Sequence, residues 1–186
     1  LSNVFCTVMK YTSKAYQKIK NQTLRAVVGG AIVASLTFII GTFDYNGAGG
    51  GIITASFTEP AKPEAFALKL LFTALTLCAG FKGGEIVPVF FVGSTFGSVI
   101  ADLSGLNCSL GASIGMISLF CGVTNCPIAS LLLSLELFGS EGIAFYALSC
   151  SISYMLSGYQ GLYSEQKILY SKLKTKYINK TIGDKN

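Results

Sequence analysis

The sequence predicts an all-α membrane protein built from short, broken helices, and three observations support this. Hydrophobic residues make up 51% of the chain and charged residues only 12%, whereas soluble domains carry about 25% charge. No Lys or Arg lies between Lys82 and Lys167. Most apolar segments are shorter than the roughly 20 residues of a full crossing, and Gly and Pro interrupt them, which favours discontinuous or re-entrant helices. An all-α soluble core is the alternative.

The elements follow from the order of apolar and polar segments. Residues 1–20 read as a basic amphipathic helix, and polar Asn21 leads into a hydrophobic helix at 24–40. Residues 41–64 are rich in Gly and turn-forming residues and are expected to form a loop. Further apolar helices are expected at 65–79, 86–101, 110–121, 127–138 and 141–157, followed by a polar, basic helix at 164–178.

The segment GFKGGEIVP is the first break between apolar helices. Pro88 suits the first position of a helix because it needs no N–H partner there. Gly83 and Gly84 leave the backbone open to a ligand. Amides at a helix start have no partner inside the helix and lie at the positive end of its dipole, so they form a candidate anion site. The residues concerned are Gly84, Glu85, Ile86 and Val87.

Glu85 is the leading functional candidate because a carboxylate at membrane depth is costly and usually functional. Beside an anion site, an ionised carboxylate repels the anion and a protonated one does not. Glu85 is therefore a candidate for coupling proton occupancy to anion occupancy. The alternative is a carboxylate that only caps the helix.

A second break, CGVTNCP, repeats the design of the first. Thr124 and Asn125 are residue types that cap helices, and Pro127 can open the next helix. We interpret these three residues as a structural turn. Glu136, inside the apolar helix that follows, is expected to pair at a helix–helix or subunit contact.

Charge and cysteine content exclude several classes. Basic residues crowd both ends of the chain, which predicts that both termini are cytoplasmic and carry a mild attraction to anionic lipid. Neither the base-stacking aromatics nor the soluble module of a nucleic-acid binder is visible. The chain has six scattered Cys without a CxxC pair and no His, so we expect no metal site and no enzyme. The N-terminus lacks Met and a signal-peptide pattern, and we expect the chain to begin inside a longer protein.

Four segments in order, GFKGGE-x-x-P-x-FF, TNCP, LELFG and GLYSEQ, resemble the second half of CLC-type chloride channels and anion/proton antiporters. The first string is most similar to the fluoride-exporting branch. Ile86 stands where the chloride-type motif has Phe, and Val87 stands where the fluoride branch commonly has Thr. The first-half filter motif and the gating-glutamate element of the family are absent from these 186 residues.

The resemblance implies a fold and a set of roles. Residues 1–178 would form the second inverted half of the CLC fold, and 179–186 a polar tail. The amides of the first break and the phenol of Tyr163, in GLYSEQ, would hold the anion. The implied partners are the lipid bilayer, the missing N-terminal half and a second copy bound through 127–157.

The implied activity is antiport of a halide anion, fluoride preferred, against protons in the plasma membrane, without a cofactor. Two alternatives remain open at this point. One is a passive anion channel of the same family. The other is a non-transporting accessory membrane protein with a degenerate site.

Overall fold

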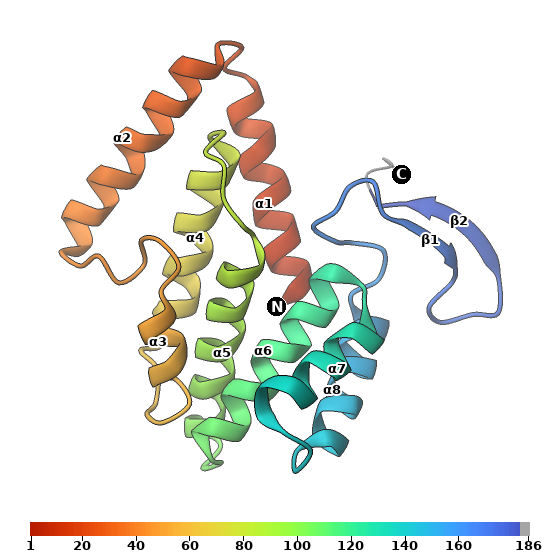
Figure 1. Ribbon diagram of the computed structural model, residues 1–186. Helices are drawn as coiled ribbons and strands as arrows, with labels where there is room; N and C mark the ends of the chain where they lie inside the picture. The colour runs from red at the N-terminus through yellow and green to blue at the C-terminus, as the bar shows by residue number, and fades with distance from the viewer. Residues whose placement is uncertain (183–186) are drawn as a thin grey trace.

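The computed structural model describes residues 1–182, which form eight helices and one two-stranded hairpin (Figure 1). The helices are α1 (Ser2–Gln17), α2 (Gln22–Ile40), α3 (Gly50–Ala55), α4 (Ala65–Cys78), α5 (Ile86–Leu103), α6 (Cys108–Thr124), α7 (Pro127–Phe138) and α8 (Ile143–Leu156). The strands are β1 (Lys167–Tyr170) and β2 (Tyr177–Thr181). The predicted helical class is confirmed, and α2 and α5 are long and apolar enough to cross a bilayer.

Helices α5 and α6 form the centre of the bundle and touch at their backbones (Figure 1). Each carries two glycines four residues apart, Gly93 and Gly97 on α5 and Gly111 and Gly115 on α6. A Cβ added at Gly97 would lie 2.1 Å from the carbonyl oxygen of Gly111. Small residues at this spacing let two apolar helices approach closely enough for dispersion contacts along their whole length.

Helices α1 and α4 pack on one side of this pair and α8 on the other. Phe5 and Cys6 of α1 are buried in a cluster with Leu70 of α4, Val92 of α5 and Leu119 of α6. On the other side, α8 packs on α6 through polar contacts: the Ser153 hydroxyl donates to the carbonyl of Ser118 (2.6 Å) and the Tyr146 hydroxyl to Ser113 Oγ (3.2 Å).

Helix α2 stands apart from the bundle and is exposed along most of its length (Figure 1). It touches α4 at Gly29, where an added Cβ would lie 2.2 Å from that of Ala79. The side chain of Phe38 is 89% exposed, so the outer face of α2 is apolar and uncovered by residues 1–182.

The segment 41–64, expected to be a loop, contains the short helix α3 and is tied to the bundle at two points. The side chain of Lys69 is only 2% exposed, and its Nζ donates to the carbonyl oxygens of Tyr45 (3.1 Å) and Gly47 (2.5 Å). Ser98 Oγ accepts from the Ala61 amide at 3.2 Å. A buried lysine thus satisfies carbonyls that the turn leaves without a backbone partner.

Both predicted breaks exist, but their ends differ from the expectation. Helix α5 begins at Ile86, so Pro88 is its third residue and not its first. Asn125 does not cap the start of α7: it closes α6 in the left-handed conformation, with φ 56°. The physical reason is that Asn tolerates this conformation, which ends a helix. Pro127 does open α7, as predicted.

The prediction of a helix at 164–178 is wrong, because this segment forms the antiparallel hairpin β1–β2. Lys167 pairs with Thr181, and Tyr170 with Tyr177. Contacts with the end of α6 hold the chain extended: the Leu162 amide donates to the carbonyl of Val123 (3.0 Å), and Gln166 Nε2 to that of Thr124 (3.0 Å). The predicted tail at 179–186 begins within β2, and residues 183–186 lie outside the described part of the chain.

Lys172, in the turn of the hairpin, holds the hairpin against the helical bundle. Its Nζ donates to Asn125 Oδ1, to Ser157 Oγ (2.8 Å) and to the carbonyl of Tyr154 (3.0 Å), and lies 4.2 Å from the centre of the Tyr154 ring. Burial lowers the pKa of Lys172 to about 8, so the amine still carries a proton at pH 7. Asn125 thereby joins the end of α6 to the hairpin.

We predict that Gly97→Ala destabilises the protein by about 1–3 kcal/mol or more, because the new Cβ meets the backbone of α6. Gly51→Ala is the matched control: it lies in α3 with open space around it and should be neutral or slightly stabilising. Thermal unfolding in detergent, followed by circular dichroism, measures both. Equal midpoints for Gly97→Ala and the wild type would contradict the close crossing.

Two substitutions at Asn125 separate its backbone role from its side-chain role. Asn125→Gly keeps the left-handed conformation and loses the bonds to Lys172, Ser157 and Gln160. Asn125→Ala loses the same bonds and adds about 1–2 kcal/mol of backbone strain. We expect Ala to be the more destabilising, and limited proteolysis within 165–176 to be faster in both variants. Protection equal to that of the wild type in both would show that Asn125 does not hold the hairpin.

Candidate functional site

The break between α4 and α5 is built from residues that leave the backbone free. Helix α4 ends at Cys78 with Ala79 as its cap, and Gly80 then adopts φ +104°, which a residue with a side chain rarely takes. Residues 81–84 form no helix or strand before α5 begins. The segment that leads into α5 is therefore exposed and has no regular secondary structure.

The predicted amides lie at the start of α5 and have no partner in the described chain. The first backbone bond at this end runs from the Val89 amide to the carbonyl of Glu85, at 3.2 Å. Pro88 has no N–H, and the N–H groups of Gly84, Glu85, Ile86 and Val87 donate to none of residues 1–182. Such donors, at the positive end of an 18-residue helix, can bind an anion without a charged side chain.

Glu85 occupies the cap position of α5, but its side chain does not cap the helix. Its backbone is already helical (φ −86°, ψ −22°), and its carboxylate accepts no bond from the amides that follow. It forms no ion pair with residues 1–182 and is half-buried. The geometry thus differs from the cap alternative and leaves the carboxylate free to face a cavity.

Two cavities meet the break from different sides. One, of about 420 Å³, is lined by Gly83, Gly84, Val87 and Pro88 together with the buried Lys69. The other, of about 640 Å³, is lined by Glu85 together with the segment that carries Gly161, Leu162 and Ser164. The start of α5 therefore borders two spaces, and Glu85 is among the residues that line the second.

Tyr163 is not among the described residues that line either of these cavities. Leu162 and Ser164, its neighbours in the chain, line the cavity that Glu85 faces, and the Leu162 amide is fixed to the carbonyl of Val123. The Tyr163 side chain is 45% exposed, and its hydroxyl has no hydrogen-bond partner among residues 1–182. The fold brings GLYSEQ near the first break, although some 75 residues of chain separate the two.

The other predicted residues lie away from this place. Thr124, Asn125 and Pro127 form the junction of α6 and α7, where the Thr124 hydroxyl donates to the carbonyl of Phe120 at 2.8 Å. Glu136 is exposed on α7 and has no ion pair or hydrogen bond with residues 1–182, so the expected pairing does not occur within the described residues, and a subunit contact stays a prediction.

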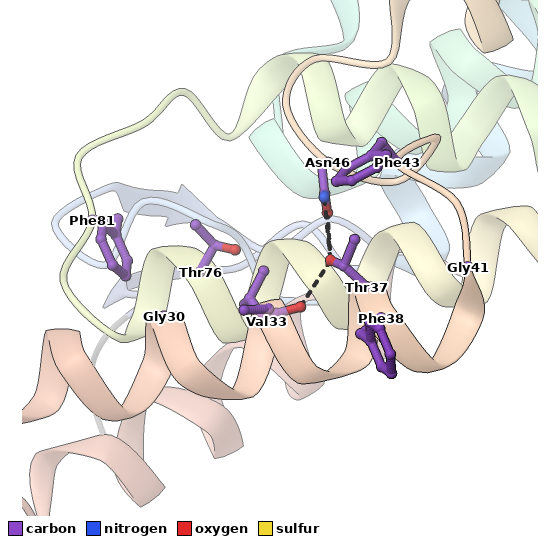
Figure 2. A pocket seen from close by; sticks show the side chains of 10 residues that line it. Gly30, Val33, Thr37, Phe38, Gly41, Phe43, Asn46, Thr76 and Phe81 are labelled. Atoms are coloured by element: carbon purple, nitrogen blue, oxygen red, sulfur yellow. Dashed lines mark hydrogen bonds between the residues drawn. The ribbon is translucent and has the colours of Figure 1, made fainter.

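Figure 2 shows a third cavity, about 680 Å³, which is apolar and lies between α2 and α4. Thr37 of α2 donates to the carbonyl of Val33 (2.8 Å) and accepts from Nδ2 of Asn46 (3.2 Å). Phe38, Phe43 and Phe81 are among the residues around it. No charged side chain is among the described residues that line this cavity, so it is a poor place for an anion.

Sequence reasoning gave little weight to two features of the site. One is Lys69, because a lone lysine within an apolar helix is a signal in itself. Lys10, Lys14 and Arg25 line the cavity of Glu85, which no local pattern indicates, because they come from α1 and α2.

Comparisons with known proteins address the family and the fold of this chain. Residues 1–158 match the family model described as "Voltage gated chloride channel". A "Chloride/fluoride channel protein" of Pseudomonas syringae pv. tomato is 36% identical over 155 residues, which cover 80% of this chain and 34% of the relative. The crystal structure of a CLC-type fluoride/proton antiporter superposes with a TM-score of 0.80 at 31% identity, covering 84% of this chain and 40% of that one.

The chain therefore spans about a third to two fifths of the length of these relatives. The family match ends before Tyr163. The predicted CLC-type helical fold and the predicted likeness to the fluoride branch are both confirmed, and the chain belongs to the voltage-gated chloride channel family.

Proposed function

We propose that this chain serves anion transport as the second half of a CLC-type fluoride/proton antiporter. One observation carries the proposal: unpaired amides at the start of α5 and the uncapped carboxylate of Glu85 lie together between two cavities. Both matched relatives are named for fluoride, one as a channel protein and one as an antiporter. The transported anion and proton are the only small species that the mechanism requires.

In this mechanism the backbone binds the anion and Glu85 links it to the proton. The N–H groups of Ile86 and Val87 hold a halide at the positive end of α5, and the Tyr163 phenol adds one neutral donor. A proton on Glu85 removes its repulsion of the anion, and loss of the proton restores that repulsion. Alternating occupancy then exchanges one ion for the other.

The proposal includes two partners. A first half of the CLC fold would cover surfaces that residues 1–182 leave open, including α2, where apolar side chains face outward. A second copy would bind over 127–157, where Ile128 and Leu132 of α7 and Leu148 and Ile152 of α8 are exposed. Helices of this kind associate by close packing within the lipid bilayer, and both termini would then face the cytoplasm.

We predict that Glu85→Gln removes the proton dependence of anion flux or lowers the flux strongly, because the side chain keeps its shape but has only a neutral form. The assay uses the chain assembled with a first half in liposomes, with fluoride and pH electrodes. Glu136→Gln is the control: it removes another carboxylate from an apolar helix, one without a described partner, and should leave coupling intact. Proton-coupled flux in Glu85→Gln would reduce this residue to a helix-end carboxylate. Flux that never opposes its own gradient in the wild type would indicate a passive channel.

We predict a smaller effect for Tyr163→Phe, which deletes one neutral donor while the helix amides remain. The net loss is about 0.5–1.5 kcal/mol, or roughly tenfold or less in anion affinity, and coupling should persist. The concentration dependence of fluoride flux gives the affinity, and Tyr11→Phe, on the exposed side of α1, is the control. An unchanged affinity in Tyr163→Phe would exclude the phenol from the anion site.

A further inference from the structure

The hairpin β1–β2 exposes apolar and basic side chains next to each other. It lies at the edge of the molecule, outside the helical bundle (Figure 1). Its exposed apolar side chains are Leu169, Tyr170, Leu173 and Tyr177. Its exposed basic side chains are Lys167, Lys174 and Lys176. Together they form the hairpin surface, which residues 1–182 leave uncovered.

The charge on the hairpin surface is of one sign and is not neutralised within the described chain. No Asp or Glu occurs among residues 166–182. Lys167, Lys174 and Lys176 form no ion pair with any of residues 1–182. Lys172, by contrast, holds the hairpin to the bundle through hydrogen bonds. The hairpin surface is therefore complementary to a negatively charged partner.

The turn between the strands is organised around the hydroxyl of Ser171. This oxygen accepts from the backbone amides of Leu173 (3.4 Å) and Lys174 (3.2 Å). The Tyr159 hydroxyl donates to the same oxygen at 3.0 Å. The Ser171 amide donates to the carbonyl of Lys176 at 2.9 Å, which closes the turn. The exposed side chains at the tip are thus carried by an ordered backbone.

The strands restrict the depth at which the hairpin can lie in a bilayer. Tyr170 and Tyr177 are opposite each other, with ring centres 5.5 Å apart and edge to face. Each strand pairs only with the other among the described residues, so each has an open edge. Backbone groups on an open edge are costly in hydrocarbon but are satisfied by water and headgroups, and tyrosine rings favour the same region.

The hairpin is attached at the ends of apolar helices. Lys172 binds Asn125 at the end of α6 and the carbonyl of Tyr154 near the end of α8. Ile182, which follows β2, lines the same cavity as Lys14 in the last turn of α1. The hairpin therefore lies on the side of the bundle where α6 and α8 end, next to the basic part of α1.

We propose that the hairpin surface binds the headgroup region of an anionic phospholipid bilayer. Its lysines contact lipid phosphate and carboxylate groups, and its Leu and Tyr side chains reach the upper part of the acyl chains. A bilayer is the anionic surface at hand, because the helices that hold the hairpin belong to a membrane protein family. The proposal does not rest on the proposed transport function, since it uses no residue of the anion site.

A single tryptophan can report whether the hairpin enters the lipid. The chain contains no Trp, so Leu173→Trp introduces its only indole, at the tip of the turn. The 186-residue chain is reconstituted in phosphatidylcholine nanodiscs with increasing phosphatidylserine, at low ionic strength. As the anionic fraction rises, we expect emission at shorter wavelength and stronger quenching by a lipid brominated near its headgroup. Both changes should weaken near 1 M salt, where the Debye length is about 3 Å.

Matched pairs of lysines test the electrostatic part. In the Leu173→Trp chain, Lys174→Gln/Lys176→Gln should lower the ratio of lipid-bound to free hairpin about fivefold per lysine. Lys18→Gln/Lys20→Gln removes the same charge from exposed positions between α1 and α2, and should change the ratio less than about twofold. Limited proteolysis of the hairpin in detergent checks that each variant keeps it on the bundle.

The outcomes decide between lipid and other occupants. Equal emission and quenching with and without phosphatidylserine would overturn the proposal, and so would an equal effect of the two lysine pairs. A shift without quenching would place a protein surface on the hairpin and would overturn it as well. The same holds for a shift that soluble glycerophosphoserine produces in neutral nanodiscs, because no bilayer surface would then be needed. If Leu173→Trp alters the proteolysis, Leu169→Trp in β1 takes its place as the reporter.

Discussion

The backbone contact between α5 and α6 is the constraint on which the rest of the structure depends. Without side chains at Gly93, Gly97, Gly111 and Gly115, the two helices touch along their length, and a Cβ at any of the four would lie within 3 Å of the other helix. Lipid is as apolar as the helices, so burial of apolar surface does not drive this pairing and close packing has to. The contact sets the direction of α5 and, with it, the place where its unpaired amides end.

Polar side chains in the interior of this fold typically bond either within their own helix or to a neighbouring segment. The buried hydroxyls in the middle of α5 bond within their own helix: Thr95 Oγ1 donates to the carbonyl of Phe91 at 2.7 Å, and Ser94 donates to the same oxygen at 3.2 Å. Ser153 links α8 to α6 along their length, and Asn125 and Lys172 make long-range contacts at the junction of α6 and α7 and the hairpin. Lys69 reaches from within α4 to the preceding segment. In a bilayer, irregular backbone survives only where such groups or a cavity satisfy it.

The sequence allowed the breaks and the helices between them to be predicted, because Gly, Pro and Asn act locally on the backbone. It did not allow the hairpin at β1–β2 to be predicted. The polar, basic composition of 164–178 favoured a helix, and what overrides it is long-range: the carbonyls of Val123 and Thr124 accept bonds from Leu162 and Gln166. The glycine spacing on α5 and α6 was readable in the sequence, but only the paired structure shows that the four residues meet.

The candidate site likewise contains residues that a local sequence pattern identifies and residues that only the fold brings together. Glu85 and the amides beside it could be identified from one short segment, since the cost of a carboxylate in an apolar context is a local argument. The cations that share its cavity could not, because Lys10 and Lys14 look like the solvated face of an amphipathic helix until α1 is seen against α4.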